Sequence, residues 1–116
     1  MDINKVYSLE ERTFLFAKNV ILFCKKLPKG IGNNEYTRQL VRSSGSVGAN
    51  YIEANESLSK KDFLMRIKIC RKEAKESGYW IRLISETNSE EFSREATSLF
   101  QETSEFRKIF SSMLGK

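Results

Sequence analysis

The spacing of apolar residues along the chain predicts four helices. From residue 9 to residue 27, apolar or small side chains recur every three or four positions, which places them on one face of a helix. The same spacing continues through residues 36–58, 63–84 and 92–113. The face of the first helix consists of Leu9, Thr13, Phe16, Val20, Phe23 and Leu27.

Capping signals separate these stretches. Ser8 precedes Leu9-Glu10-Glu11 in the form of a capping box, so we expect the first helix to begin there and to end before Pro28. The second helix is expected to begin near Asn33 or Asn34, since either can cap it, and Ser59 is expected to cap the third.

The fourth helix follows a break at Thr87-Asn88-Ser89. Every connection is short, and short connections make sequential helices run antiparallel. We therefore predict an all-α fold, an antiparallel up-down-up-down four-helix bundle that forms a single domain over residues 1–116.

The second helix carries two apolar stripes. Its core stripe consists of Tyr36, Leu40, Val47, Tyr51, Ala54 and Leu58. The second stripe consists of Val41, Gly45, Gly48 and Ile52. Each glycine costs a helix about 1 kcal/mol relative to alanine, so something should offset the loss. Two explanations remain open: a close crossing of two helices within the subunit, or an oligomer interface on this second stripe.

A third, polar stripe on the same helix consists of Arg42, Ser46, Asn50 and Glu53. The third helix carries Glu73 and Glu76 beside bulky apolar residues. Paired carboxylates can serve acid–base catalysis, but no nucleophile, metal-ligand cluster or glycine-rich phosphate loop accompanies these. The sequence favours a structural polar network that fixes the register of the two helices, with no catalytic residues.

Composition narrows the chemistry further. The 116 residues are 40% hydrophobic and 30% charged, and they include no histidine and only two cysteines. This excludes histidine relays and the usual zinc sites, so we expect no enzyme activity, no cofactor and no metal. Cys24 and Cys70 fall at core-facing positions. Met1-Asp2-Ile3-Asn4-Lys5 lacks the order of a signal peptide, and no stretch is long enough to span a membrane, so a cytoplasmic location is expected.

The formal net charge of +5 is concentrated in the third helix, because residues 59–86 hold eight basic and four acidic side chains. On a helical wheel, six basic residues share an arc of about 120°. They are Lys61, Lys68, Arg71, Lys72, Lys75 and Arg82. Tyr79 lies among them, and a single aromatic residue is weak evidence for base stacking.

Three interpretations of this basic face remain open. It is a solvated surface, or it binds the backbone of RNA or DNA, or it contacts acidic residues of another chain. The fourth helix offers such an acidic stripe to a neighbouring subunit. Its members are Glu91, Glu95, Glu102 and Glu105.

Residues 42–54 resemble the helix-two motif of the four-helix bundle protein family, also called the 23S rRNA intervening-sequence proteins. That motif reads approximately Arg-x-x-x-Ser-(Val/Ile)-x-x-Asn-Ile-x-Glu-(Gly/Ala). The matching residues are Arg42, Ser46, Val47, Asn50, Glu53 and Ala54. Tyr51 departs from the motif, because an aliphatic residue is more usual there. Residues 59–64, residues 73–77 and Trp80 are similar to the family's third helix.

The resemblance implies a small single-domain bundle that assembles as a homopentamer and has no catalytic activity. Some members are encoded within insertions in bacterial large-subunit rRNA genes, and a related group engages nucleic acid. We therefore expect a homo-oligomeric helical module that binds rRNA or other nucleic acid non-specifically through the basic face of the third helix. The alternative is a protein-interaction scaffold ring without a nucleic-acid ligand, docking an acidic partner protein or none; neither alternative involves a membrane.

Overall fold

Four helices in a computed structural model account for most of residues 8–115, the part of the chain that the structure describes. They are α1 (Leu9–Cys24), α2 (Ile31–Asn55), α3 (Lys60–Thr87) and α4 (Ser93–Met113), and a short 3₁₀ turn, η1 (Glu90–Phe92), precedes α4. Residues 1–5, whose order is unlike that of a signal peptide, lie outside the described residues.

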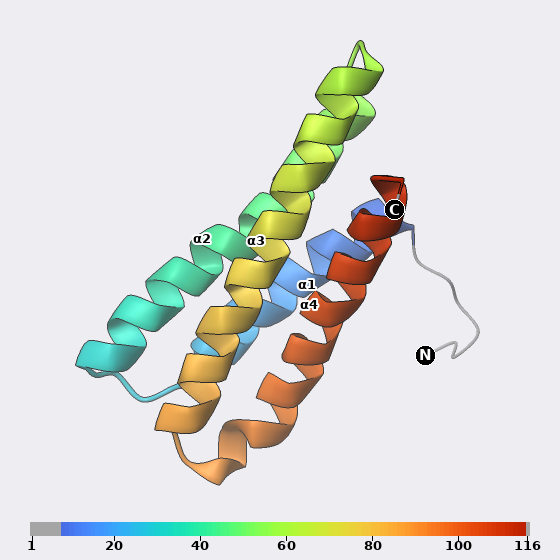
Figure 1. Cartoon of the computed structure of the whole chain (residues 1–116). Coiled ribbons are helices and arrows are strands. Elements are labelled where there is room, and N and C mark those ends of the chain that lie inside the picture. Colours follow the sequence, from blue (N-terminus) through green and yellow to red (C-terminus); the bar gives the residue numbers. More distant parts are fainter. Residues whose placement is uncertain (1–7, 116) are drawn as a thin grey trace.

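The helices form an up-down-up-down bundle in which each packs antiparallel to the next (Figure 1). The long α3 lies between α2 and α4, and α1 packs mainly on α2. The predicted all-α antiparallel bundle is therefore confirmed. The largest fully buried apolar side chains at its centre are Phe23, Phe106, Phe110, Leu40, Ile67, Ile81 and Ile84.

The helix starts follow the capping signals at two of three places. The hydroxyls of Ser8 and Ser59 each accept a 3.1 Å hydrogen bond from a backbone N–H three residues on, as predicted. The predicted start of α2 at Asn33 or Asn34 is wrong, because α2 begins at Ile31 after Gly30. The Asn33 side chain instead donates 2.8 Å hydrogen bonds to the Pro28 carbonyl and the Asn88 side chain.

Unequal helix lengths shape the molecule. The 25 residues of α2 and 28 of α3 correspond to about 38 and 42 Å, against about 24 Å for the 16 residues of α1. The connected ends of α2 and α3 therefore project beyond the other two helices (Figure 1). We call residues 52–65 the hairpin tip. Leu58, expected in the core, is 99% exposed there because α2 ends at Asn55.

Both cysteines are free and contact the core, as their positions predicted. Cys70 is buried, and its thiol donates to the Val47 carbonyl at 3.5 Å, while Cys24 is half-buried. Burial raises the pKa of Cys70 to about 12 and that of Cys24 to about 11, so both thiols stay protonated at neutral pH. None of the helices in residues 8–115 is long and apolar enough to cross a membrane.

Candidate functional site

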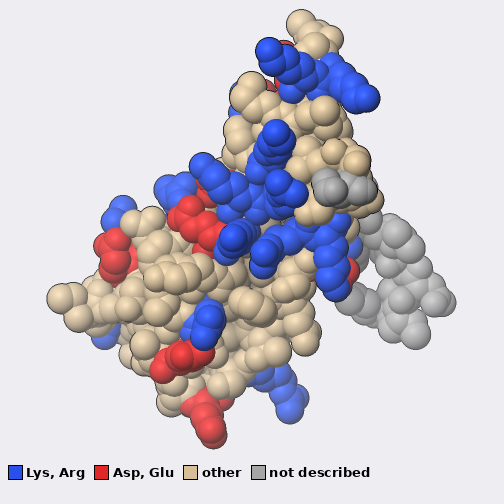
Figure 2. Space-filling model, in the orientation of Figure 1, with Lys and Arg blue, Asp and Glu red and all other residues tan. Residues whose placement is uncertain are grey.

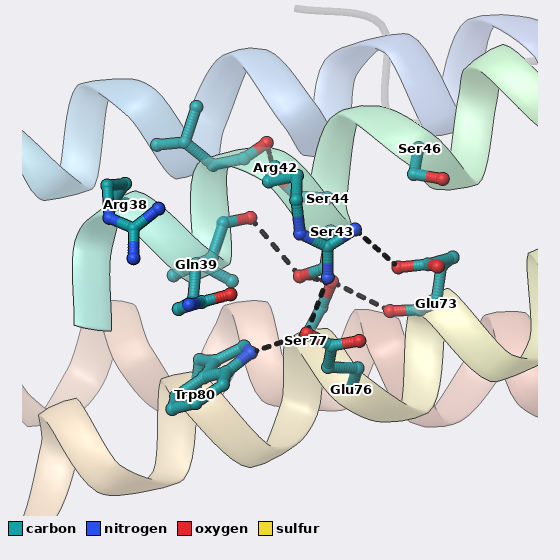
Figure 3. Close-up of polar contacts among 12 residues, drawn as sticks. Arg38, Gln39, Arg42, Ser43, Ser44, Ser46, Glu73, Glu76, Ser77 and Trp80 are labelled. Carbon is teal, nitrogen blue, oxygen red and sulfur yellow. Dashed lines mark hydrogen bonds and ion pairs between the residues drawn. The ribbon is translucent and has the colours of Figure 1, made fainter. Parts of the chain in front are cut away.

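An ion-pair cluster joins the middle of α2 to the middle of α3 (Figure 3). Arg42 extends from α2, and its Nη2 donates a 2.6 Å hydrogen bond to Glu76 Oε2. The indole Nε1 of Trp80 donates to the same oxygen at 2.9 Å, from one turn further along α3. The Trp80 ring stacks on Tyr36 of α2, with ring centroids 6.1 Å apart. These contacts join the middle of α2 to the middle of α3.

Glu73 belongs to the same cluster but is incompletely bonded. Glu73 is only 7% exposed, and its Oε1 lies 3.5 Å from Arg42 Nη1. At this distance the Arg42 cation compensates the negative charge of Glu73, yet Oε1 has no hydrogen-bond partner among the described residues. Burying a carboxylate oxygen without a hydrogen bond lowers the stability of the fold. The burial of Glu73 therefore depends on the nearby charge of Arg42.

A buried serine pair lies beside the ion pairs, and sequence reasoning missed it. The hydroxyls of Ser43 and Ser77 are 2.8 Å apart, and Ser77 donates to the Glu73 carbonyl at 2.9 Å. Both residues are fully buried. The signal was present, since Ser43 lies three residues after Leu40 and four before Val47 on the core stripe of α2. Small side chains there let the helices approach closely.

The rest of the predicted polar stripe forms a second group. Asn50 donates to the Ser46 hydroxyl at 2.9 Å and accepts a 2.8 Å hydrogen bond from Arg66 Nη1 of α3, a partner that the sequence did not indicate. Glu53 is not brought into the network. It is exposed, and its carboxylate makes no hydrogen bond or ion pair within residues 8–115. The polar residues therefore form two separate contacts between α2 and α3, one around Arg42 and one around Asn50, where the sequence predicted a single network.

The environment of Glu76 predicts how acid affects folding. Its pKa lies below the ordinary glutamate value, chiefly because Trp80 donates a hydrogen bond to the carboxylate, and also because Arg42 bonds and attracts it. A lowered pKa stabilises the fold above the unfolded-state value of about 4.3, and this stability is lost as the pH falls through the folded-state value. We expect Glu76→Gln to weaken the acid dependence of the free energy of unfolding, measured by urea titration between pH 7 and pH 3. An unaltered pH dependence would contradict this assignment.

A basic groove runs between α3 and α4. It encloses about 750 Å³, and none of its lining residues is acidic. The lining residues are Lys68, Arg71, Lys72, Lys75, Ser104, Arg107, Lys108 and Ser111. Arg71 Nη1 donates to the Ser111 hydroxyl at 3.1 Å and so ties the two walls together. In Figure 2 the Lys and Arg side chains gather over the middle of α3 and the adjoining part of α4.

The groove contains part of the predicted basic face and adds to it. Lys61 lies at the start of α3, outside the groove, and Arg82 lies beyond its other end, paired with Glu86 at 3.2 Å. Arg107 and Lys108 of α4 were not predicted as site residues. Helical spacing puts them on the same face of α4 as Ser104 and Ser111, and the packing of α4 turns that face toward α3.

Three members of the acidic stripe on α4 are engaged inside the chain, and one of them, Glu105, forms a 3.8 Å ion pair with the groove residue Lys108 of the same helix. Glu102 accepts two hydrogen bonds from Arg12 of α1, at 3.1 and 2.8 Å. Glu95 accepts from Lys26 at 3.0 Å. A neighbouring subunit's basic helix would have to compete with these bonds, so the structure weakens the explanation of the stripe as an interface.

The second apolar stripe of α2 divides into two environments. A Cβ added at Gly48 would lie 3.0 Å from Thr13 Oγ1 of α1, so this glycine permits a close crossing within the subunit. A Cβ at Gly45 would meet nothing within 4 Å. Val41 and Ile52 are exposed, the latter by 50%. The intramolecular explanation thus applies to Gly48, while the other three residues face outward.

These features define a class: a small antiparallel four-helix bundle with an Arg–Glu cluster between α2 and α3 and a basic groove between α3 and α4 (Figures 2 and 3). The profile of the 23S rRNA-intervening sequence protein family matches residues 6–112, and the chain belongs to that family. The resemblance carried by residues 42–54 is therefore confirmed.

One solved structure shares the whole fold. It is the crystal structure of a protein with unknown function from the S23 ribosomal protein family of Bacteroides thetaiotaomicron. The similarity has a TM-score of 0.80 at 25% sequence identity and covers 94% of this chain and 100% of that chain. No match was found among curated proteins.

Proposed function

We propose that this protein is a non-catalytic helical module that binds the phosphate backbone of RNA or other nucleic acid through the basic groove. The observation that carries the proposal is the set of six cationic side chains lining one groove with no acidic residue among them. Four belong to α3 and two to α4, so the helix packing concentrates cations from two elements along one line.

The arrangement suits a polyanion better than a single small anion. Lys68, Lys72 and Lys75 follow the groove over two turns, a length of about 10 Å, which matches a ligand with charges at regular intervals. Phosphate contacts give affinity without sequence readout. Binding is therefore expected to be largely independent of base sequence.

Self-association is a second part of the proposal, with a homopentamer as the assembly expected from the family. Val41, Gly45 and Ile52 support it, because they form an exposed apolar and small-residue surface along α2. Repetition of the basic groove around a ring would raise the avidity for a long polyanion without new contacts.

Charge reversal tests the groove. We expect the triple variant Lys68→Glu, Lys72→Glu, Lys75→Glu to bind labelled RNA at least about 100-fold more weakly at low salt, because attraction becomes repulsion. The slope of log affinity against log salt should shrink by about 3, since each lost phosphate contact removes about one unit. Fluorescence anisotropy across a salt series measures both quantities.

The matched control reverses Lys18, Lys25 and Lys29, which are exposed and lie outside the groove. Its net charge changes by the same amount, so only the position of the charges differs. We expect a much smaller loss of affinity and a nearly unchanged salt slope. Equal losses in the two triple variants, or no binding by the native protein even at low salt, would overturn the proposal.

A further inference from the structure

The surface between α3 and α4 continues past the basic groove as an apolar hollow. This hollow encloses about 350 Å³, and its lining includes Ile81, Arg82, Glu86, Ala96, Thr97 and Phe100. Phe100 is 39% exposed, although large aromatic side chains are usually buried in the core of a protein. Because Phe100 leaves apolar area in contact with water, the hollow is suited to an apolar or aromatic occupant.

The helix register places the hollow and the groove in line. Arg71 meets Ser111 in the groove, and seven residues further along α3 a Cβ at Gly78 would lie 3.5 Å from the Phe100 ring. Phe100 also precedes Ser104, a groove residue, by one turn of α4. The cationic and aromatic parts are therefore adjacent segments of one α3/α4 surface.

We infer that this surface takes a single-stranded nucleic acid, with its phosphates along the basic groove and one base stacked on Phe100 in the apolar hollow. The inference rests on the proposed nucleic-acid function and specifies the form of the ligand. A cationic groove combined with an exposed aromatic side chain is the usual arrangement for binding single strands, because every base has a face that stacks.

The chemistry of the hollow favours a base over another phosphate. Glu86 lines the hollow and pairs with Arg82 at 3.2 Å, so the local cation is already compensated. An uncharged aromatic ring fits there, whereas a phosphate would meet a carboxylate. In a duplex the bases are stacked inside, and taking one out of the stack costs free energy, so a duplex would use the groove alone.

Oligonucleotides that differ only in their bases test this directly. We expect an ordinary RNA strand to bind the native protein at least about tenfold more tightly than an abasic strand of equal length and charge, since stacking contributes about 1–3 kcal/mol per base. A duplex should bind like the abasic strand, with affinity from phosphate contacts. A strand carrying 2-aminopurine should change its fluorescence on binding as the base stacks.

Substitutions locate the stacking residue. Phe100→Ala should weaken ordinary single-strand binding about tenfold, leave abasic-strand binding and the salt slope unchanged, and abolish the 2-aminopurine response. Phe100→Tyr should restore both the single-strand affinity and the 2-aminopurine response, because it keeps an aromatic ring. Phe14→Ala is the matched control, since Phe14 is also an exposed phenylalanine, 61% accessible, but on α1.

The outcomes separate this inference from the proposed function. Equal binding of ordinary, abasic and duplex ligands would overturn the single-strand inference and leave the phosphate-binding groove intact. Failure of all nucleic acids to bind, or displacement of RNA by polyglutamate at equal charge concentration, would overturn both. If Phe100→Ala fails to fold, the abasic and 2-aminopurine measurements on the native protein still decide the question.

Discussion

Gly48→Leu is expected to destabilise the subunit by about 3 kcal/mol, because its side chain has no room between α1 and α2. A Cβ there already lies 3.0 Å from Thr13 Oγ1, 3.3 Å from Thr13 Cβ and 3.6 Å from the Thr13 backbone carbon. Thr13 is itself buried and cannot move aside without shifting α1. Urea unfolding should show a lower midpoint, and an unchanged midpoint would contradict the close crossing.

Gly45→Leu is the matched substitution on the same stripe. Apart from the neighbouring backbone of α2, no atom of residues 8–115 lies within 4 Å of a Cβ at this position, and replacing a helical glycine gains up to about 1 kcal/mol of helix propensity. The subunit should therefore stay folded, while a bulky side chain disturbs any neighbouring subunit on this surface. We expect light scattering to show smaller assemblies than the native protein forms. An unchanged mass would place Val41, Gly45 and Ile52 outside the interface.

Arg42→Met is expected to lower the free energy of unfolding by about 2–3 kcal/mol at pH 7. Methionine keeps the apolar stem but removes the cation that bonds Glu76 and compensates the buried Glu73. The loss should be smaller than for a fully buried pair, because the Arg42 side chain is half exposed. Urea titration at several pH values measures the effect.

The pH dependence identifies the cause. Arg42 is one of the groups that hold the pKa of Glu76 below its ordinary value, so its removal brings that pKa closer to the unfolded-state value. The stability gap between the variant and the native protein should therefore be fully present above the unfolded-state value of about 4.3 and should narrow as the pH falls below it through the folded-state pKa of Glu76. Arg38→Met is the control, since Arg38 forms an exposed ion pair with Glu35, worth less than about 1 kcal/mol. Equal losses in the two variants would contradict the role given to Arg42.

Local signals in the sequence were sufficient for most of the fold. Ser8 and Ser59 cap their helices through bonds to residues three positions away, so a short window contains all the information. The start of α2 was missed because its N-cap, Gly30, has no side chain to signal the cap, while the Asn33 side chain bonds Asn88, which is 55 residues distant in the chain. Leu58 was misplaced because its spacing continues the core stripe beyond the point where α2 ends.

The site was predictable to the extent that one helix defines it. A helical wheel places Lys68, Arg71, Lys72 and Lys75 on one side of α3, and all four line the groove. The opposite wall depends on how α4 is rotated against α3, which the spacing on α4 alone does not determine. Arg107 and Lys108 therefore emerged only from the packing. The hydrogen bonds between Arg12 and Glu102 also depend on how α4 packs against another helix, so the sequence did not predict them.

The hairpin tip has an energetic consequence for the bundle. Over residues 52–65, α2 and α3 extend past α1, so backbone hydrogen bonds there are supported by little beyond the partner helix (Figure 1). Exposed Ile52, Leu58 and Met65 contribute little burial energy. Local opening at this tip is therefore expected to cost less free energy than unfolding of the core, which carries the groove.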